Sequence, residues 1–278
     1  MRFSKMHGLG NDFIFINGFK EKLPRDLADF SKKLCHRRLG IGADGLIALL
    51  PSEREDVIAS FVYYNADGSQ AEMCGNGMRC AALFARQEGI TCEESFALET
   101  PAGLIRPEII SEPARLVRVD MGPPRLLPGE IPALFSGSRI VAAPLNLGEK
   151  TFFVTVLSMG NPHCVIFVDD VVNYPVVKIG PQIEQHHFFP AKTNVEFIEL
   201  VNESKIKMRV WERGCGETLA CGTGACAAAV AAILNGYTKN EVEVQLKCGS
   251  LFIEWHEGSA VQMLGPAVEV YRGEYVDF

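Results

Sequence analysis

The sequence contains one segment twice, with the two copies 147 residues apart. The first copy, EMCGNGMRCAA, covers residues 72–82, and the second, LACGTGACAAA, covers residues 219–229. Between residues 74 and 89, seven positions match their counterparts 147 residues later: Cys74, Gly75, Gly77, Ala81, Ala82, Ala85 and Gly89. An internal duplication constrains the fold strongly, because each copy is expected to occupy the same place in one of two similar domains.

A helix is predicted to start at each copy. The first begins near Cys74 and ends before Gly89, and the second begins near Cys221 and ends before Gly236. Glycine is the residue that most readily adopts the left-handed conformation in which many helices end. The second helix includes the run CAAAVAAIL, which has no charged side chain, so we expect it to be buried on all sides.

Most of the remaining chain is predicted to form β-strands, since short apolar runs rich in β-branched and aromatic residues are bounded by turn residues. These runs are 13–16, 57–64, 152–157, 164–168, 195–200, 206–211 and 251–255. Each duplicated helix is followed by two strands around a tight turn, at 96–100 and 104–110 and at 242–247 and 251–256. Further helices are predicted at 26–37 and 179–188, and a linker rich in proline and glycine at 122–138. The pattern indicates an α+β fold of two homologous domains, each with strands wrapped around one hydrophobic helix.

Composition argues against several classes of protein. The chain has 278 residues, long enough for two cores, and its formal net charge of −7 argues against a nucleic-acid partner. No apolar run approaches the length of a membrane span, and the N-terminal MRFSKMHGLGNDF lacks the hydrophobic stretch of a secretory signal. We therefore expect a cytoplasmic protein that binds neither nucleic acid nor membrane.

The nine cysteines indicate neither a disulfide framework nor a zinc site. Their number is odd, they are widely spread, and their closest spacings are longer than those of paired zinc ligands. A cysteine is most often a small apolar core residue, an interpretation that suits Cys35, Cys92 and Cys248. Cys80 and Cys226 are assigned to helix packing, because they fall at different offsets in the two copies.

Cys74 and Cys221 are candidates for chemistry because both copies retain the loop Cys-Gly-x-Gly. A thiol in the first turn of a helix lies at the positive end of the helix dipole, which stabilises the thiolate and lowers the pKa of the thiol. The N–H groups that follow, at 75–76 and 222–223, are available to an anion such as a carboxylate. Two such thiols on either side of one carbon could remove a proton from one face and supply a proton to the other. The expected result is stereoinversion.

The chain resembles the diaminopimelate epimerase family, which belongs to the pyridoxal-independent, two-cysteine amino-acid racemases. The resemblance covers nearly the whole chain through MHGLGNDF (6–13), GIGADG (40–45), NADGSQAEMCGNGMRCAA (65–82), TPAG (100–103), GNPHCV (160–165), TNVEF (193–197) and WERGCGETLACGTGACAAA (211–229). It implies two domains, 1–121 and 122–266, with a tail, 267–278, that returns to the first. It also implies that each domain is a curved, mostly antiparallel sheet or barrel around its central helix, with the active site in the interdomain cleft.

The resemblance also assigns roles to particular residues. It implies that Cys74 and Cys221 are the acid/base pair, that His163 and Glu212 tune them, and that neither a cofactor nor a metal takes part. The substrate-binding positions that it implies are Asn11, Asn65, Gly75, Asn76, Asn161, Asn194, Glu212, Arg213, Gly222 and Thr223. Gly45 departs from the family, since some members have a glutamine there that makes a further substrate contact.

Several of these residues also have ordinary structural interpretations. His163 follows a proline and precedes an apolar strand, as a core histidine does, and Glu212 and Arg213 suit a solvated strand end. Asn11 and Asn161 each follow a glycine in a turn, where asparagine is common for conformational reasons. Arg213 can nevertheless bind a carboxylate through two hydrogen bonds, and Glu212 can pair with an ammonium group.

We therefore expect an isomerase that interconverts LL- and meso-diaminopimelate, a step in the synthesis of lysine and cell-wall precursors. Three alternatives stay open at this point. The first is a racemase of proline, hydroxyproline or glutamate with the same two cysteines. The second is a redox-sensing protein whose cysteines switch by oxidation, and the third is an isomerase like those of phenazine biosynthesis, which lack the paired cysteines. The expected partner is a small amino-acid substrate, and a homodimer is a further possibility.

Overall fold

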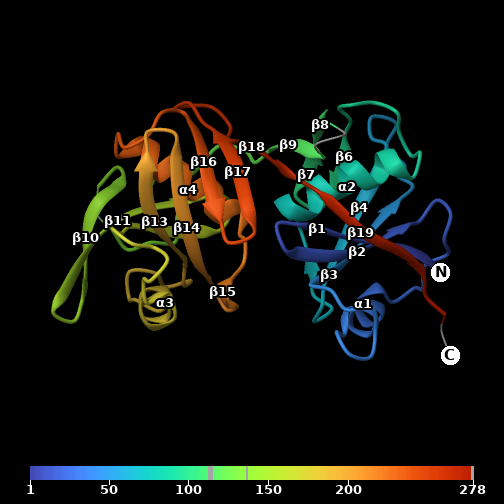
Figure 1. The fold of residues 1–278 in the computed structure, drawn as a ribbon, viewed down its shortest axis with the longest axis horizontal. Helices are drawn as coiled ribbons and strands as arrows, with labels where there is room; N and C mark the ends of the chain where they lie inside the picture. Colours follow the sequence, from blue (N-terminus) through green and yellow to red (C-terminus); the bar gives the residue numbers. More distant parts are fainter. Residues whose placement is uncertain (112–114, 136, 277–278) are drawn as a thin grey trace. The chain divides into compact units, whose positions relative to one another are not determined.

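The computed structural model describes residues 1–111, 115–135 and 137–276, and the chain divides into two compact units (Figure 1). Unit 1 comprises Met1–Asp120 and Leu264–Phe278, and unit 2 comprises Met121–Met263. Each unit therefore contains one copy of the duplicated segment. Within the described residues, none of the helices has an apolar stretch long enough to cross a membrane.

Unit 1 combines a mixed sheet, a hairpin and helices. Its elements are β1 (Arg2–Gly8), β2 (Asn11–Asn17), α1 (Leu27–Cys35), β3 (Gly45–Leu50), β4 (Ala59–Asn65), β5 (Gln70–Ala71), α2 (Gly75–Gln87), β6 (Leu98–Thr100), β7 (Gly103–Ile105), β8 (Glu108–Ser111), β9 (Leu116–Asp120) and β19 (Val268–Glu274). The strands of the sheet pair in the order β19-β1-β2-β3-β4-β6-β7, and β5 pairs with β4. Strands β8 and β9 form the hairpin.

Unit 2 is built on the same plan. Its elements are β10 (Ile140–Leu147), β11 (Lys150–Ser158), β12 (Pro162–Phe167), α3 (Val176–Glu184), β13 (Asn194–Asn202), β14 (Lys205–Glu212), β15 (Gly216–Thr218), α4 (Gly222–Leu234), β16 (Glu241–Leu246) and β17 (Gly249–Glu254), and β18 (Gln262–Pro266) spans the boundary with unit 1. The strands pair in the order β10-β11-β12-β13-β14-β16-β17, and β15 pairs with β14.

Both sheets contain antiparallel and parallel pairs. The parallel pairs are β2–β3 and β4–β6 in unit 1, and β12–β13 and β14–β16 in unit 2. Parallel neighbours need a crossover connection. Here a helix lies in each crossover, α1 and α2 in unit 1 and α3 and α4 in unit 2. The predicted α+β class is confirmed, with mixed sheets in which antiparallel pairs are the majority.

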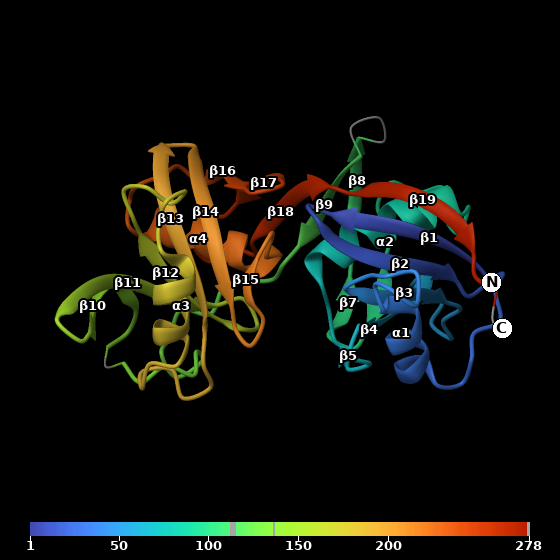
Figure 2. The ribbon, with the colours of Figure 1, turned by 60° about the horizontal axis from the view of Figure 1, so that its bottom comes forward.

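The middle strands of unit 1 are buried on both faces because a helix covers each face (Figure 2). Ile14 of β2 shares a core cluster with Leu34 of α1. The next residue, Phe15, points to the other face, where its ring centroid lies 5.1 Å from that of Phe84 of α2. Two covered faces explain why these strands read as continuous apolar runs.

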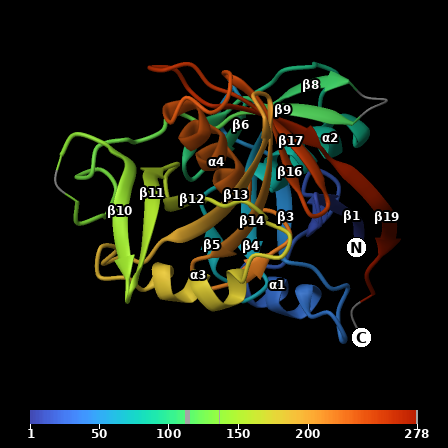
Figure 3. The same ribbon diagram turned by 60° about the vertical axis from the view of Figure 1, so that its left-hand side comes forward.

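Unit 2 repeats this arrangement around β13 (Figure 3). Phe197 packs in a core cluster with Ile183 of α3. The preceding residue, Glu196, points to the opposite face, toward Gly224 of α4. This side chain is 0% exposed, so the strand carries a buried carboxyl group toward the start of α4.

The predicted boundaries of α2 and α4 are confirmed. Both helices have 13 residues and begin directly after the cysteine of the repeat. Gly89 and Gly236 follow their ends with φ of 70° and 71°, the left-handed conformation that favours glycine. Helix α4 is buried from Gly224 to Ala232, as its lack of charge predicts.

Two predicted elements are wrong in their bounds. The helix expected at 179–188 is α3, Val176–Glu184, and it begins directly after Pro175, whose missing N–H costs nothing at a helix start. The strand expected at 104–110 is divided into β7 and β8. Pro107 causes the break, because it cannot donate to a strand ladder and it restricts the backbone of Arg106.

The predicted linker at 122–138 is not a free connection. Within it, Ile131 and Ala133 are 1% and 9% exposed and belong to the core cluster of unit 2. Residue 136 of this segment lies outside the described residues.

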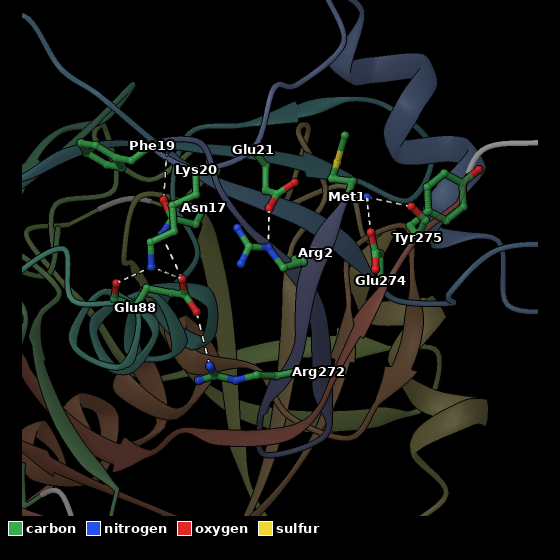
Figure 4. Close-up of polar contacts among 10 residues, drawn as sticks. All are labelled: Met1, Arg2, Asn17, Phe19, Lys20, Glu21, Glu88, Arg272, Glu274 and Tyr275. Atoms are coloured by element: carbon green, nitrogen blue, oxygen red, sulfur yellow. Dashed lines mark hydrogen bonds and ion pairs between the residues drawn. The ribbon is translucent and has the colours of Figure 1, made fainter.

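The end of the chain is attached to unit 1. Strand β19 pairs antiparallel with β1. Around it, the N-terminal amino group of Met1 donates to the carbonyl oxygen of Tyr275 at 2.9 Å, and Arg272 Nη1 lies 3.4 Å from Glu88 Oε1 (Figure 4). Lys20 pairs with the same carboxylate at 3.0 Å, so polar contacts join the first strands, α2 and the tail.

Candidate active site

The two cysteines of the repeat occupy the same position at the starts of α2 and α4. Cys74 and Cys221 are N-cap residues with extended backbones. The sulfur of each accepts a hydrogen bond from the N–H three residues later, from Gly77 at 3.5 Å and from Gly224 at 3.4 Å. Ser, Thr and Asp side chains do the same at ordinary helix starts. Both sulfurs therefore lie at the positive end of a helix dipole.

In unit 1, two asparagine side chains lie beside Cys74. Asn11 Oδ1 accepts hydrogen bonds from Asn76 Nδ2 at 3.1 Å and from Cys74 Sγ at 3.7 Å. Gly75 is the first residue of α2. We call Asn11, Cys74, Gly75 and Asn76 the first half-site. Asn11 therefore presents a hydrogen-bond acceptor, its Oδ1 atom, to the sulfur of Cys74.

A cluster of charged residues fixes the amide of Asn11. Its Nδ2 donates to Asp44 Oδ2 at 2.8 Å, and because a carboxylate only accepts, Oδ1 must point toward Cys74. Arg37 bridges Asp44 and Asp12, and Lys5 lies 2.6 Å from Asp12. Burial raises the pKa of Asp12, but hydrogen bonds from Arg37 and Lys5 outweigh it and lower this pKa to about 2.

A buried cation fixes the other amide. Arg79 of α2 is 0% exposed and donates to Asn76 Oδ1 at 2.7 Å. It also donates to the carbonyl oxygens of Pro266 at 3.2 Å and Gly75 at 3.4 Å. The contact with Pro266 links the chain segment before β19 to the first turn of α2.

Asn65 and Gly45 lie opposite each other on β4 and β3. Asn65 Nδ2 donates to Ser69 Oγ at 2.9 Å, and none of the hydrogen bonds among the described residues joins its side chain to the first half-site. A Cβ atom on Gly45 would lie 2.4 Å from Tyr63 Cε2 and 2.7 Å from a backbone oxygen of Tyr64. The ring of Tyr63 therefore excludes a glutamine at position 45.

In unit 2, a chain of hydrogen bonds leads from Cys221 into the core. Thr223 Oγ1 lies 3.5 Å from Cys221 Sγ and accepts from Asn161 Nδ2 at 3.4 Å. Asn161 Oδ1 lies 2.9 Å from His163 Nε2, and His163 Nδ1 lies 2.7 Å from Glu196 Oε1. We call Asn161, His163, Cys221, Gly222 and Thr223 the second half-site.

Burial dominates the electrostatics of the second half-site. Burial raises the pKa of Cys221 well above its usual value, the charges of Glu212 and Glu196 raise it further, and hydrogen bonds from Thr223 and Gly224 lower it. Burial also raises the pKa of Glu196. Its Oε2 is buried and has no hydrogen-bond partner among the described residues.

The remaining predicted residues of unit 2 lie on the chain around β14. Asn194 Oδ1 accepts from the backbone N–H of Arg213 at 2.9 Å, while Arg213 Nη1 donates to the carbonyl oxygen of Ala191 at 3.1 Å. Glu212 Oε1 accepts from the hydroxyl of Thr218. Asn194 is thus brought to Arg213, and Glu212 is close enough to Cys221 to raise its pKa.

Besides the charged cluster that fixes Asn11, several further supporting residues were not predicted as site residues. Glu184 of α3 accepts from Trp211 Nε1 at 2.7 Å and from the N–H of Gly214 at 3.0 Å, so it holds the segment that carries Glu212 and Arg213. Arg79 and Glu196 are two more, and both are fully buried. The signal for both was a charge within an otherwise apolar helix or strand, GMRCAA and NVEFIE.

The structure corrects the assignment of two cysteines. Cys80 and Cys226 are buried in their helices and Cys35 is buried, as predicted. Cys92 and Cys248 are exposed, so they are not core residues. All nine cysteines fall in the described part of the chain, and none forms a disulfide there. No group of three or more His, Cys, Asp or Glu side chains among the described residues is arranged to hold a metal ion.

Comparison with solved structures defines the fold class. A probable proline racemase from Agrobacterium radiobacter aligns with a TM-score of 0.70 and 15% identity, over 99% of this chain and 92% of its own. A phenazine biosynthesis protein of the PhzF family from Bacillus anthracis aligns with a TM-score of 0.70 and 16% identity, over 100% of this chain and 99% of its own. The chain therefore has the fold shared by these racemase-like and PhzF-like proteins.

Sequence comparison identifies the family. The family model for diaminopimelate epimerase matches residues 3–127 and 155–270. A diaminopimelate epimerase from Pelotomaculum thermopropionicum is 54% identical over 278 residues, covering 99% of both chains. The chain belongs to the diaminopimelate epimerase family. The predicted family is confirmed, and with it the enzyme class, an isomerase of lysine biosynthesis.

Proposed function

We propose that this enzyme interconverts LL- and meso-diaminopimelate by two-base proton transfer, with Cys74 and Cys221 as the acid/base pair. The observation that supports this most strongly is the repeated geometry of the two thiols. Each caps a 13-residue helix through the same hydrogen bond, and each lies beside neutral side chains that can bind a carboxylate. Membership of the family supports the choice of substrate.

In the proposed reaction, the two half-sites act on opposite faces of one α-carbon. One cysteine, as the thiolate, removes the α-proton, and the other, as the thiol, donates a proton to the opposite face. The N–H groups at 75–76 and 222–223 bind the adjacent carboxylate at two helix N-termini. They stabilise the negative charge that builds up there as the carbanion forms.

The distal amino-acid group of the substrate is assigned to Asn65, Asn194, Glu212 and Arg213. The Arg213 guanidinium has five N–H donors and suits the distal carboxylate, while Glu212 suits an ammonium group. Both belong to the segment that Glu184 holds. In this proposal, His163 and Glu212 tune the cysteines rather than exchange protons with the substrate.

We also propose the domain limits 1–121 with 267–278, and 122–266, each domain being a curved sheet around its central helix. The common strand order of the two units supports descent from one duplicated domain. A cytoplasmic location is supported by the absence of disulfides among the nine described cysteines. The homodimer stays a prediction, which light scattering on the purified protein would test.

Incubation with LL-diaminopimelate under reducing conditions tests the function, with chiral chromatography of the products. We expect the meso form to accumulate to equilibrium. Proline, 4-hydroxyproline and glutamate serve as alternative substrates in parallel, and inversion of one of these with no turnover of diaminopimelate would favour the racemase alternative. A protein that exchanges the α-proton of none of them, but whose cysteines respond reversibly to peroxide, would favour the redox alternative.

A further inference from the structure

The buried pair His163–Glu196 must hold two protons. Both side chains are 0% exposed, and Glu196 Oε2 has no partner in the described structure. An ionised Glu196 beside a neutral histidine would leave one uncompensated charge in the core, which burial opposes. The pair is therefore net neutral, either as imidazolium and carboxylate or as neutral imidazole and carboxylic acid.

Both of these states place a proton on His163 Nε2, because an acid proton on Glu196 Oε2 would have no acceptor in the described structure and must therefore lie on Oε1, toward Nδ1. With a proton also between Nδ1 and Glu196 Oε1, the Nε2–H group must donate to Asn161 Oδ1, at 2.9 Å. The Asn161 amide is then oriented with Nδ2 toward Thr223, which accepts at 3.4 Å. The hydroxyl hydrogen of Thr223 is left to donate to Cys221 Sγ, at 3.5 Å.

We propose that Glu196 is a positioning residue that sets the direction of this hydrogen-bond chain, so that Thr223 donates to the sulfur of Cys221. The first half-site has the opposite polarity, because Asn11 presents an acceptor to Cys74. The inference deepens the proposed function and rests on it for the role of Cys221. The ionisable groups that face Cys221 are Glu196 on β13 and Glu212 on β14, with His163 on β12 next in the chain.

A double-mutant cycle tests the direction of the chain. The rate at which iodoacetamide alkylates Cys221 at a fixed pH reports its thiolate fraction, and peptide mass spectrometry separates it from Cys74. We expect Thr223→Val to slow alkylation of Cys221 about tenfold, since a hydrogen bond to a charged group shifts a pKa by about one unit or more. In a Glu196→Met background, Thr223→Val should have almost no effect on the alkylation rate, because the hydroxyl of Thr223 no longer points to the sulfur of Cys221.

Two further variants keep the test decisive. Glu196→Gln can donate its amide N–H to His163 Nδ1, so the effect of Thr223→Val should return to about tenfold. Asn161→Asp accepts on both sides, diverts the hydroxyl of Thr223, and should abolish that effect even if Glu196→Met does not fold. The alkylation of Cys74 should be unchanged throughout.

Equal effects of Thr223→Val with and without Glu196 would overturn the proposal, as a purely structural role for Glu196 makes the two changes additive. The readout does not require turnover. Failure of the relay is therefore distinguishable from failure of the epimerase assignment, which the wild-type reaction with LL-diaminopimelate tests separately.

Discussion

The two half-sites have the same backbone arrangement at the helix start but differ in the ionisable residues that are buried behind them. Ile47 of β3 and Glu196 of β13 occupy corresponding places, since a Cβ atom on Gly77 would lie 2.8 Å from Ile47 and one on Gly224 would lie 2.8 Å from Glu196. Within the helices, by contrast, the buried ionisable residue belongs to the first half-site. Arg79 of α2 corresponds to Cys226 of α4, and both are 0% exposed.

A duplicated motif thus fixes the place of the thiol, and the residues that were not duplicated decide its environment. In the first half-site the buried cation Arg79 fixes the amide of Asn76, and Asp44 fixes the amide of Asn11 from outside. The second has a buried carboxyl group, and its one amide, that of Asn161, is fixed from inside by His163. A reaction that runs in both directions needs one thiol and one thiolate, and different surroundings can favour one protonation state at each position.

The largest expected effect comes from removing either thiol. Cys74→Ala and Cys221→Ala should each lower kcat for epimerisation by about 10³-fold or more, because in the proposed reaction each is the acid/base for one face. Cys92→Ser and Cys248→Ser are matched controls at exposed positions and should keep near-normal activity. Near-normal turnover of either alanine variant would contradict the proposal that both half-sites act, since only one of them would then transfer a proton.

Solvent isotope should label the product before the substrate. In the proposed reaction, the thiolate returns its proton to the original face, whereas the thiol of the other half-site has exchanged with solvent before substrate binds. In deuterium oxide at low conversion, we expect deuterium at the inverted carbon of the meso product and little in the recovered LL substrate. Mass spectrometry of both species measures this, and equal labelling of the two would indicate a single base.

The buried charge of Arg79 should contribute measurably to the free energy of unfolding, and the residue in its place in α4 should contribute less. Arg79→Met should lower the free energy of unfolding by about 3 kcal/mol, because it leaves the buried acceptors of Asn76, Gly75 and Pro266 without their donor. The corresponding change in unit 2, Cys226→Ala, removes one sulfur atom from the packed core and should cost about 1 kcal/mol. Urea unfolding of both variants provides the comparison, and equal losses would show that Arg79 acts only by filling space.

The sequence predicts the helices of both half-sites well because their signals are local. Cys74, Gly89 and their counterparts mark where each helix begins and ends, and the apolar run of α4 predicts its burial. The division of 104–110 at Pro107 was also a local signal, although the apolar residues around it obscured the break.

The residues behind the half-sites could not be predicted in this way. Arg79 finds its partners on α2 and at Pro266, and Glu196 finds His163 on a neighbouring strand, 33 positions earlier in the chain. Sequence alone shows a charge in an apolar element, but the partner that makes its burial tolerable is set by strand pairing. The exposure of Cys92 and Cys248 likewise depends on which loops cover them.

The smallest expected effect is a change in the stability of unit 1 with pH, and it involves the first half-site alone. The pKa of Asp12 is lowered from 3.8 to about 2, because Arg37 and Lys5 bind its ionised form. A depressed pKa contributes stability that is present above the unfolded value and is lost as the pH falls through the folded value. Asp12 should therefore stabilise unit 1 by about 1–2 kcal/mol at neutral pH, with partial screening by solvent, and by almost nothing at pH 2.

Asp12→Asn tests this dependence through hydrogen exchange of the peptide covering β2, measured by mass spectrometry. Exchange should be faster in the variant than in the wild type at pH 7, and the difference should shrink as the pH falls from about 4 to 2. Asp56→Asn is the matched control, since Asp56 pairs with Arg54 at an exposed position outside the cluster that fixes Asn11. A difference between Asp12→Asn and wild type that does not depend on pH would show that the carboxylate acts by shape. Peptides of unit 2 should not respond, because the groups that hold Asn161 are buried and contain neither Asp12 nor its partners.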